Sequence, residues 1–253
     1  MRVFSSSVSV PLPPAQLALV LPCYHPPLSW AGNILTSLAK LEALLPPATT
    51  VHLYVVNDGT ETGVTPADIA LLTQALPGAF TYLAYPLNQG KGHALRTGIA
   101  RVREPYCIFT DIDFPYQETS VAALYALLQT GADVAVGVRD DGYYAQIPPA
   151  RRRVSRLLRR LTKHVLRLPV DDTQCGLKGF NEAGRRLFLR TTTKRYLFDL
   201  ELLFLAARQG SLRVLPLAVE LKPNVVFSRL NPRILLTESL NFIRILGRRL
   251  EQE

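Results

Sequence analysis

The sequence predicts an α/β protein with a mainly parallel β-sheet flanked by helices. Short apolar runs rich in Val, Ile, Leu and Tyr alternate along the chain with longer segments of helical periodicity. The apolar runs are nearly continuous, which is typical of strands that are covered on both faces of a sheet. The chain has 253 residues, 48% of them hydrophobic, and no Gly/Ser-rich linker divides it. We therefore expect a single domain that spans residues 1–253.

The first half of the chain alternates strands and helices without a break. The expected strands are short and apolar and lie at 17–22, 52–58, 80–85, 106–111 and 132–138. Apolar residues at helical spacing between them predict helices at 29–45, 66–76, 91–102 and 120–131. This alternation favours parallel pairing, because a helix can return the chain to the start of the next strand.

The second half of the chain is less regular. Its expected elements, in order, are a loop at 140–150, a basic helix at 151–168, a loop that enters a short strand at 171–180, a helix at 198–210, a strand at 211–221 and an amphipathic helix at 232–250. We expect the helix at 198–210 to end at Gly210, because glycine tolerates the left-handed conformation that closes many helices.

Cysteine usage and charge narrow the class of protein. The three cysteines, Cys23, Cys107 and Cys175, are far apart and odd in number. They predict buried thiols rather than disulfides, and the four scattered histidines argue against a zinc site.

No apolar run approaches the roughly 20 residues that cross a bilayer, and the first residues lack a signal-peptide core, so we expect a cytoplasmic protein. The net charge of +9 suits a nucleic acid, an anionic membrane or a phosphorylated substrate.

Two carboxylates stand at the end of the expected strand 106–111: Asp111 and Asp113, with one residue between them. Residues two apart in a strand face the same side, so the pair can converge if the extended geometry continues. A divalent cation such as Mg²⁺ or Mn²⁺ would offset their repulsion and leave ligand positions for substrate phosphates. The alternative is an aspartate that caps a turn beside an ordinary surface aspartate.

A second polar turn, Asn57-Asp58-Gly59, also follows an expected strand. In open α/β sheets, ligands bind beyond the carboxyl ends of the strands. Both acidic turns therefore point to a functional site at that edge of the sheet.

Eight segments in order along the chain resemble the family 2 glycosyltransferases of GT-A fold: LVLPCYH, VVNDGT, NQGKGHALRTGI, TDID, ADVAVGVRD, RRRVSR, DTQCGLKGF and YLFDLELL. DID followed by TQCGLKGF and FDLELL is typical of the dolichol- or polyprenyl-phosphate sugar transferases. The resemblance implies an inverting, metal-dependent hexosyltransferase that moves a sugar from GDP-mannose or UDP-glucose to a polyprenyl or dolichyl phosphate. It implies a nucleotide-sugar half at 1–138, an acceptor half at 139–231 and an amphipathic helix at 232–253.

The resemblance also implies a nucleotide-sugar site. Its expected members are Pro22, Tyr24, Asn57, Asp58, Lys91, Asp111 and Asp113. Asn57 and Asp58 match the place where the family binds the base and ribose, and Lys91 lies near a helix N-terminus that favours phosphate. Asp111 and Asp113 would bind Mg²⁺ or Mn²⁺. Plain turns remain the alternative at residues 57–59 and before Lys91.

The expected catalytic residues are Asp113 and Asp199. A hydroxyl acceptor needs a base to remove its proton, and Asp199 or Glu201 in FDLE would occupy that place. A lipid phosphate is already an anion at neutral pH, so its attack needs positioning and a nearby cation instead.

The resemblance places the acceptor phosphate beside cationic and hydroxyl side chains of the second half. They are Arg139, Arg153, Ser155, Arg156 and Lys178. For Lys178, a solvated lysine at a strand end is the alternative.

The basic helix expected at 151–168 has a cationic stripe beside a leucine-rich stripe. Such a helix can lie at an anionic membrane surface, and the helix at 232–253 would add a second contact. A helix that packs on the core and exposes a solvated charged face is the alternative. We expect a protein peripheral to the inner, cytoplasmic face of a membrane, where it docks directly or through a membrane-protein partner.

The chain departs from the family pattern at two places. Many relatives have glutamine two positions after the second aspartate, but this chain has Pro115 there, with Gln117 displaced. The first strand ends in Cys23-Tyr24-His25, where relatives often have Tyr-Asn-Glu. A third protein ligand for the metal is therefore not assigned.

Three other functions remain open from the sequence. One is a glycosyltransferase that acts on a soluble or protein hydroxyl, and another is a catalytically inactive scaffold. The third is a basic nucleic-acid-binding module that uses residues 151–167. It leaves Asp111 and Asp113 unexplained and shows no nucleic-acid-binding motif, so we expect no nucleic-acid partner.

Overall fold

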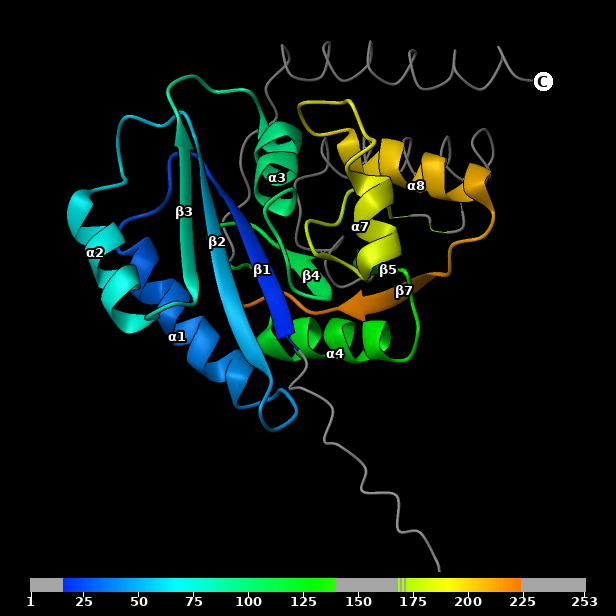
Figure 1. Ribbon diagram of the computed structural model, residues 1–253, viewed down its shortest axis with the longest axis horizontal. Coiled ribbons are helices and arrows are strands. Elements are labelled where there is room, and N and C mark those ends of the chain that lie inside the picture. The colour runs from blue at the N-terminus through cyan, green and yellow to red at the C-terminus, as the bar shows by residue number, and fades with distance from the viewer. Residues whose placement is uncertain (1–15, 140–167, 169, 171, 224–253) are drawn as a thin grey trace, which may run out of the picture.

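A computed structural model describes residues 16–139, 168, 170 and 172–223. In the first half, strands and helices alternate as expected (Figure 1). The strands are β1 (Gln16–Cys23), β2 (Thr50–Asp58), β3 (Phe80–Tyr85), β4 (Tyr106–Phe109) and β5 (Val134–Arg139). The helices between them are α1 (Trp30–Glu42), α2 (Pro66–Ala75), α3 (Lys91–Ile99) and α4 (Glu118–Gln129).

The described part of the second half adds β6 (Lys178–Phe180), α7 (Glu182–Phe188), α8 (Phe198–Gln209) and β7 (Val214–Val219). The seven strands form one sheet in the order β3-β2-β1-β4-β6-β5-β7. β6 runs antiparallel to both of its neighbours, β4 and β5, and every other pair is parallel. The expected α/β class with a mainly parallel sheet is confirmed.

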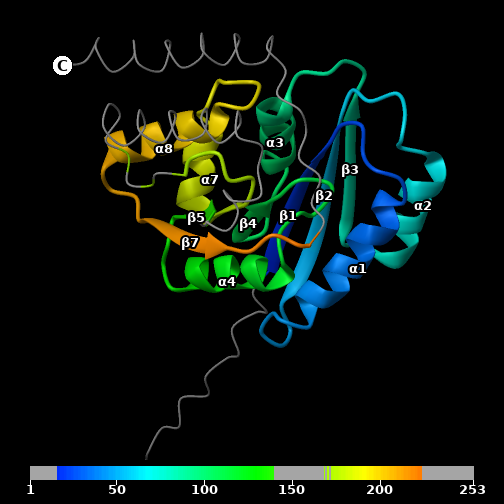
Figure 2. The ribbon, with the colours of Figure 1, turned by 180° about the vertical axis from the view of Figure 1, so that it is seen from behind.

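Helices cover both faces of the sheet, and alternate residues of each strand supply the two cores (Figures 1 and 2). On one face, Leu17, Leu19 and Leu21 of β1 pack with α1, α2 and α4. On the other face, Ala18 and Val20 pack with α3, α7 and α8. This double coverage explains why the central strands are continuous apolar runs in the sequence.

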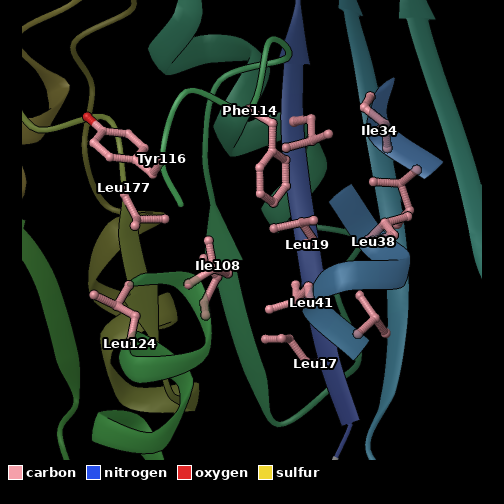
Figure 3. Close-up of a cluster of buried hydrophobic side chains, with 14 of the residues drawn as sticks. Leu17, Leu19, Ile34, Leu38, Leu41, Ile108, Phe114, Tyr116, Leu124 and Leu177 are labelled. Carbon is pink, nitrogen blue, oxygen red and sulfur yellow. The ribbon is translucent and has the colours of Figure 1, made fainter. Parts of the chain in front are cut away.

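The first of these cores extends to the chain that follows β4. Figure 3 shows Phe114 and Tyr116 beside Leu19, Ile108 and Leu177 in this cluster. Both aromatic residues are buried, with 2% and 4% of their surface exposed. The segment that carries the two expected metal ligands is therefore anchored in the hydrophobic core.

Local sequence signals set several element ends. Thr65 and Asp68 form a reciprocal capping box at the start of α2, and Pro66 occupies its first turn, where a missing N–H costs nothing. α8 ends at Gly210, which has the left-handed φ of 65° that the sequence predicts for this position.

The structure differs from the sequence expectations in two elements. The strand expected at 106–111 ends at Phe109, and a short helix, α7, follows β6 where no element was expected. Several expectations concern residues outside the described part: the loop at 140–150, the basic helix up to residue 167 and the helix at 232–253. Among the residues that the structure does describe, none of the helices is both long and apolar enough to cross a bilayer.

Candidate active site

The carboxyl ends of β1, β2, β3 and β4 form one edge of the sheet, since these strands are parallel. The arrow of β3 points to this edge at the top of Figure 1. In the strand register, Cys23 lies opposite Asn57, and Asp58 lies opposite Tyr85. The loops that leave this edge hold most of the residues expected to bind the donor, as is usual for ligand sites in such sheets.

The two expected metal ligands lie in a turn rather than in a strand. Phe114 N donates to Asp111 O at 2.9 Å, and Phe114 has a left-handed φ of 47°. The extended geometry expected past residue 110 is therefore wrong. The turn still presents both carboxylates on the open side, because Ile112 and Phe114 are buried while Asp111 is half-buried and Asp113 is exposed.

Lys91, the first residue of α3, forms an ion pair with Asp111. Its Nζ lies 2.5 Å from Asp111 Oδ1. Burial lowers the pKa of Lys91, but the carboxylates of Asp111 and Asp199 more than offset this, and the pKa lies above its ordinary value. A charged ammonium group therefore stands beside the acidic turn, as the sequence predicts for the phosphate end of a nucleotide.

Asp113 is exposed, but its ionised form is electrostatically disfavoured. The surrounding protein desolvates its carboxyl group, and Asp111 adds like-charge repulsion, so the pKa of Asp113 is raised. A cation would relieve this repulsion. Within the described ranges, no group of three or more His, Cys, Asp or Glu side chains is arranged to hold a metal. Two neighbouring carboxylates fit an ion that takes its other ligands from water and substrate phosphates.

Gly176 lies directly against the Lys91–Asp111 ion pair and forms one wall of the site. A Cβ at this position would lie 2.7 Å from Asp111 Oδ2 and 3.5 Å from Lys91 Nζ. The neighbouring backbone is fixed, since Gly176 N donates to the hydroxyl of Tyr116 at 3.0 Å. Only a residue without a side chain leaves Asp111 its observed position.

The side chain of Asn57 forms hydrogen bonds that stabilise the turn after β2. Its Oδ1 accepts a hydrogen bond from Thr60 N at 2.8 Å, and its Nδ2 donates to Tyr82 Oη at 2.9 Å. The residue is buried, with 8% of its surface exposed. The side chain of Asn57 therefore stabilises this turn, and its expected role as a ligand stays a prediction.

The carboxylate of Asp58 also forms several hydrogen bonds within the fold. The residue is 3% exposed, and its carboxylate accepts hydrogen bonds from Tyr85, Asn88, Gln89 and Gly90. A direct contact to base or ribose would have to replace one of these bonds. The nucleotide-binding role expected for Asp58 stays a prediction.

The end of β1 offers one exposed aromatic ring. Tyr24 is 47% exposed and packs against His25 with ring centroids 4.1 Å apart. Pro22 is buried within β1, opposite Val56 of β2. Of these two expected donor contacts, Tyr24 has the access to stack on a base, and Pro22 shapes the strand beneath it.

Lys178 and Asp199 form a buried ion pair between β6 and the first turn of α8. Lys178 Nζ lies 2.7 Å from Asp199 Oδ1 and donates to Thr173 O at 3.0 Å and Cys175 O at 2.6 Å. Lys178 is completely buried, so its ammonium has no donor to offer an acceptor phosphate. Neither expectation for Lys178, the phosphate contact or the solvated lysine, agrees with this geometry.

The same pair argues against Asp199 as a general base. Burial raises the pKa of Asp199, and Lys178 and Lys91 offset this only in part. A raised pKa would suit a base, but only 6% of the side chain is exposed, and it faces Lys178. Glu201, the other candidate base, instead accepts from Thr192 N at 2.9 Å and Thr193 N at 2.7 Å.

Arg139, at the end of β5, is held by Asp172. Its Nε and Nη2 donate to the two carboxylate oxygens at 2.8 and 2.6 Å, and its backbone N–H donates at 2.9 Å. Burial raises the pKa of Asp172, but the bonds and charge of Arg139 more than offset this and hold the pKa below its usual range. The other expected acceptor contacts, Arg153, Ser155 and Arg156, lie outside the described residues.

Three residues that shape the site were not singled out from the sequence: Tyr116, Asp172 and Gly176. Asp172 and Gly176 belong to a segment that the sequence did identify, DTQCGLKGF, but only Lys178 was chosen from it. The doubled aspartate at 171–172, followed closely by glycine and a buried lysine, is the signal that could have found Asp172. Tyr116 had no comparable signal, because its partners come from a loop 60 residues away.

Comparisons with known proteins agree with this architecture. The family model "Glycosyl transferase family 2" matches residues 18–186. The dolichyl-phosphate beta-glucosyltransferase of Drosophila melanogaster is 28% identical over 208 residues, which cover 77% of this chain and 63% of the relative. The human protein of the same name is 28% identical over 206 residues, covering 77% and 64%. The chain thus spans less than two thirds of the length of these relatives.

Solved structures share the fold. Glucosyl-3-phosphoglycerate synthase from Mycobacterium tuberculosis, in complex with Mn²⁺, UDP and glucosyl-3-phosphoglycerate, superposes with a TM-score of 0.60. The two chains are 19% identical, and the match covers 88% of this chain and 75% of the synthase. A structure of that synthase with Mg²⁺ and UDP has a TM-score of 0.55 at 17% identity, covering 88% and 74%. This likeness confirms the GT-A fold.

Proposed function

The chain belongs to glycosyl transferase family 2, and on that premise we propose that it transfers glucose from UDP-glucose to a polyprenyl phosphate. The observation that carries the proposal is the Lys91–Asp111 ion pair beside the exposed Asp113, at the ligand-binding edge of the sheet. The names of the similar proteins, dolichyl-phosphate beta-glucosyltransferases, support glucose over mannose. Their β-linked product supports inversion at the anomeric carbon, since glucose is α-linked in UDP-glucose.

Asp111 and Asp113 would hold Mg²⁺ or Mn²⁺. Bound there, the metal would neutralise charge on the diphosphate as it leaves. The raised pKa of Asp113 supports this role, because desolvation and the like charge of Asp111 both disfavour its carboxylate, and a bound cation would stabilise it. Lys91, already charged and directed at Asp111, would contact the donor phosphates. Tyr24 would stack on the base at the other end of the site.

The surroundings of the candidate bases favour a phosphate acceptor over a hydroxyl acceptor. Asp199 faces Lys178, and Glu201 binds backbone amides, so neither is placed to take a proton from a substrate. A phosphate acceptor is already ionised and needs no such base. For that phosphate we propose contacts with Arg139, Arg153, Ser155 and Arg156.

A polyprenyl acceptor keeps its tail in a bilayer, so we propose that the chain works at the cytoplasmic face of a membrane. The net charge of +9 supports contact with an anionic surface, either directly or together with a membrane-protein partner. On this proposal, residues 1–138 bind the donor and residues 139–231 bind the acceptor.

Ligand-dependent thermal stability tests the donor assignment. We expect UDP-glucose with Mn²⁺ or Mg²⁺ to raise the melting temperature, and chelation with EDTA to remove the increase. A ligand at a hundred times its Kd stabilises a fold by about 2.7 kcal/mol. GDP-mannose should have a weaker effect at equal concentration. Stabilisation by RNA or DNA with no response to any sugar nucleotide would instead support a nucleic-acid-binding protein.

A further inference from the structure

The acidic turn, residues 111–114, is joined to the chain that follows β7. Just beyond the turn, residues 115–117 pair with residues 220–222 through an antiparallel bridge and two backbone hydrogen bonds. One of these bonds runs from Lys222 N to Pro115 O at 2.8 Å. The backbone that leaves the turn is therefore held by a segment from the far end of the described chain.

The side chain of Lys222 extends this link to two helices. Its Nζ donates to Ser37 Oγ of α1 at 2.9 Å and forms an ion pair with Glu118 Oε1, at the start of α4, at 2.7 Å. Nζ also lies 4.7 Å from the centroid of the Phe114 ring, within the distance of about 6 Å at which an aromatic face attracts a cation. The side chain of Glu118 is buried and that of Lys222 is half-buried, so solvent screens these contacts only in part.

Phe114, the residue whose ring Lys222 covers, is the neighbour of Asp113 in the turn. Its φ of 47° lies in the left-handed region, which a phenylalanine rarely adopts unless its surroundings hold it there. The ring is buried in the hydrophobic core (Figure 3), with the ammonium group of Lys222 against its face. Because Asp113 directly precedes Phe114, a shift of the ring would also move the Asp113 carboxylate relative to Asp111.

Lys222 is not placed to bind a metal itself. An ammonium group has no lone pair to offer a metal, and the group is engaged by Glu118 and Ser37. Its positive charge alone would disfavour a cation at Asp113. A favourable effect of Lys222 on metal binding must therefore come through the conformation of the acidic turn.

We infer that Lys222 is a positioning residue for the acidic turn. It supports the left-handed conformation of Phe114, and so holds the carboxylates of Asp111 and Asp113 on the open side of the turn. The inference rests on the proposed function only where the turn holds a metal, because the contacts of Lys222 belong to the chain itself. On the proposed function, the segment after β7 thus supports a donor site in the first half of the chain.

Hydrogen exchange of the Phe114 amide, followed by NMR, tests the inference without metal or substrate. Phe114 N donates to Asp111 O at 2.9 Å, so its N–H reports whether the turn is closed. Lys222→Met should increase its exchange rate about tenfold, and Lys222→Arg, which keeps a cation over the ring, should stay within about twofold of the wild type. Thr60 N, which donates to Asn57 Oδ1 at 2.8 Å in another turn at this edge, is the internal control and should exchange at an unchanged rate. An unchanged Phe114 rate in a folded Lys222→Met variant would overturn the inference.

Mn²⁺ affinity, measured from the electron paramagnetic resonance signal of the free ion, separates positioning from charge. Lys222→Met should weaken Mn²⁺ binding about tenfold, the low end of the range for residues that orient metal ligands. The loss of a positive charge alone would instead strengthen binding. Lys40→Met, which removes an exposed charge from α1, is the matched control and should change the affinity by less than about twofold. Stronger or unchanged binding by Lys222→Met would contradict the positioning role.

Ser37→Ala provides a second variant if Lys222→Met fails to fold. It removes one hydrogen bond to Lys222 and changes no charge, so it should weaken Mn²⁺ binding about threefold and raise the exchange rate of the Phe114 amide. Wild-type values for both measurements in Ser37→Ala would refute the inference. Wild-type protein that binds no Mn²⁺ would refute the metal role in the proposed function, while the exchange rate of Phe114 would still decide the role of Lys222.

Discussion

At the centre of the candidate site, positively and negatively charged side chains alternate. Lys91 stands between the carboxylates of Asp111 and Asp199, and Asp199 in turn pairs with Lys178. Asp113 is the one of the three aspartates that is exposed, and its pKa is raised. On the proposed function, Asp113 and the open side of Asp111 would hold the cation, while the Lys178–Asp199 pair lies inside the fold.

Gly176→Ala tests how tightly the wall of the site fits Asp111. The added methyl would lie 2.7 Å from Asp111 Oδ2, too close for a stable contact, so the carboxylate must move. We expect roughly tenfold weaker binding of UDP-glucose with metal, with an unchanged fold by circular dichroism. Gly32→Ala is the matched control, because no atom lies within 4 Å of a Cβ at that position. Equal donor affinity in both variants would show that Asp111 is not held at this wall.

The sequence identified several of these residues but not the contacts that they make within the fold. Asp111 and Asp113 could be singled out because they follow a buried strand directly. The contacts of Lys178 and Asp58 could not be predicted, since their partners come from other segments: Asp199 lies 21 positions from Lys178, and Gln89 lies 31 positions from Asp58. Sequence spacing indicates which residues can bind a ligand, but not which are already engaged with one another.

Among the elements, the short strand β6 is linked to α8 by one buried ion pair. Lys178 of β6 and Asp199 of α8 are 0% and 4% exposed. Lys178 also donates to two carbonyls of the preceding loop, so one side chain organises the strand, the loop and the helix together.

Lys178→Met should destabilise the protein strongly, because it leaves Asp199 buried without its partner. The expected loss in unfolding free energy is about 3–5 kcal/mol, measured by urea denaturation. The double variant Lys178→Met/Asp199→Leu should recover part of the loss. Arg186→Ala breaks the exposed pair with Glu182 and serves as control, with an expected loss of at most about 0.5 kcal/mol. Similar losses for both single variants would contradict the structural role of the buried pair.

At this scale the sequence predicted the strands and helices well and their ends less well. The alternation of apolar runs and amphipathic segments predicted the sheet, because each central strand is buried on both faces. β4 is shorter than expected since the chain turns after Phe109 to bury Ile112 and Phe114. α7 was missed because its 7 residues span only two turns, too few to show a period.

The whole molecule is stabilised by several carboxylates whose pKa values are lowered on folding. Burial raises the pKa of Asp172 and of Glu201, but Arg139 more than offsets this for Asp172, and hydrogen bonds from Thr192 and Thr193 do so for Glu201. A depressed folded pKa contributes stability above the unfolded carboxyl value of about 4, and this contribution is lost as the pH falls through the folded pKa. We therefore expect the protein to lose stability in acid, below about pH 4.

Asp172→Asn tests this linkage. At neutral pH the variant should lose about 3–5 kcal/mol, because the buried guanidinium of Arg139 loses the opposite charge of Asp172. Its unfolding free energy should then fall less steeply in acid than that of the wild type, since one proton-linked contribution is gone. Glu182→Gln, at an exposed site, should change neither value appreciably. Parallel pH profiles for wild type and Asp172→Asn would contradict the assignment.

Transfer of labelled glucose from UDP-glucose to a lipid most directly tests the central claim of a phosphate acceptor. The measurement compares polyprenyl phosphate with the polyprenol of the same length, which lacks only the phosphate, in detergent with Mg²⁺ or Mn²⁺. We predict label in the organic phase with the phosphate, none with the alcohol, and none with Asp113→Asn. Label on the alcohol or on a water-soluble acceptor, with none on the phosphate, would contradict the account, as would undiminished transfer by Asp113→Asn.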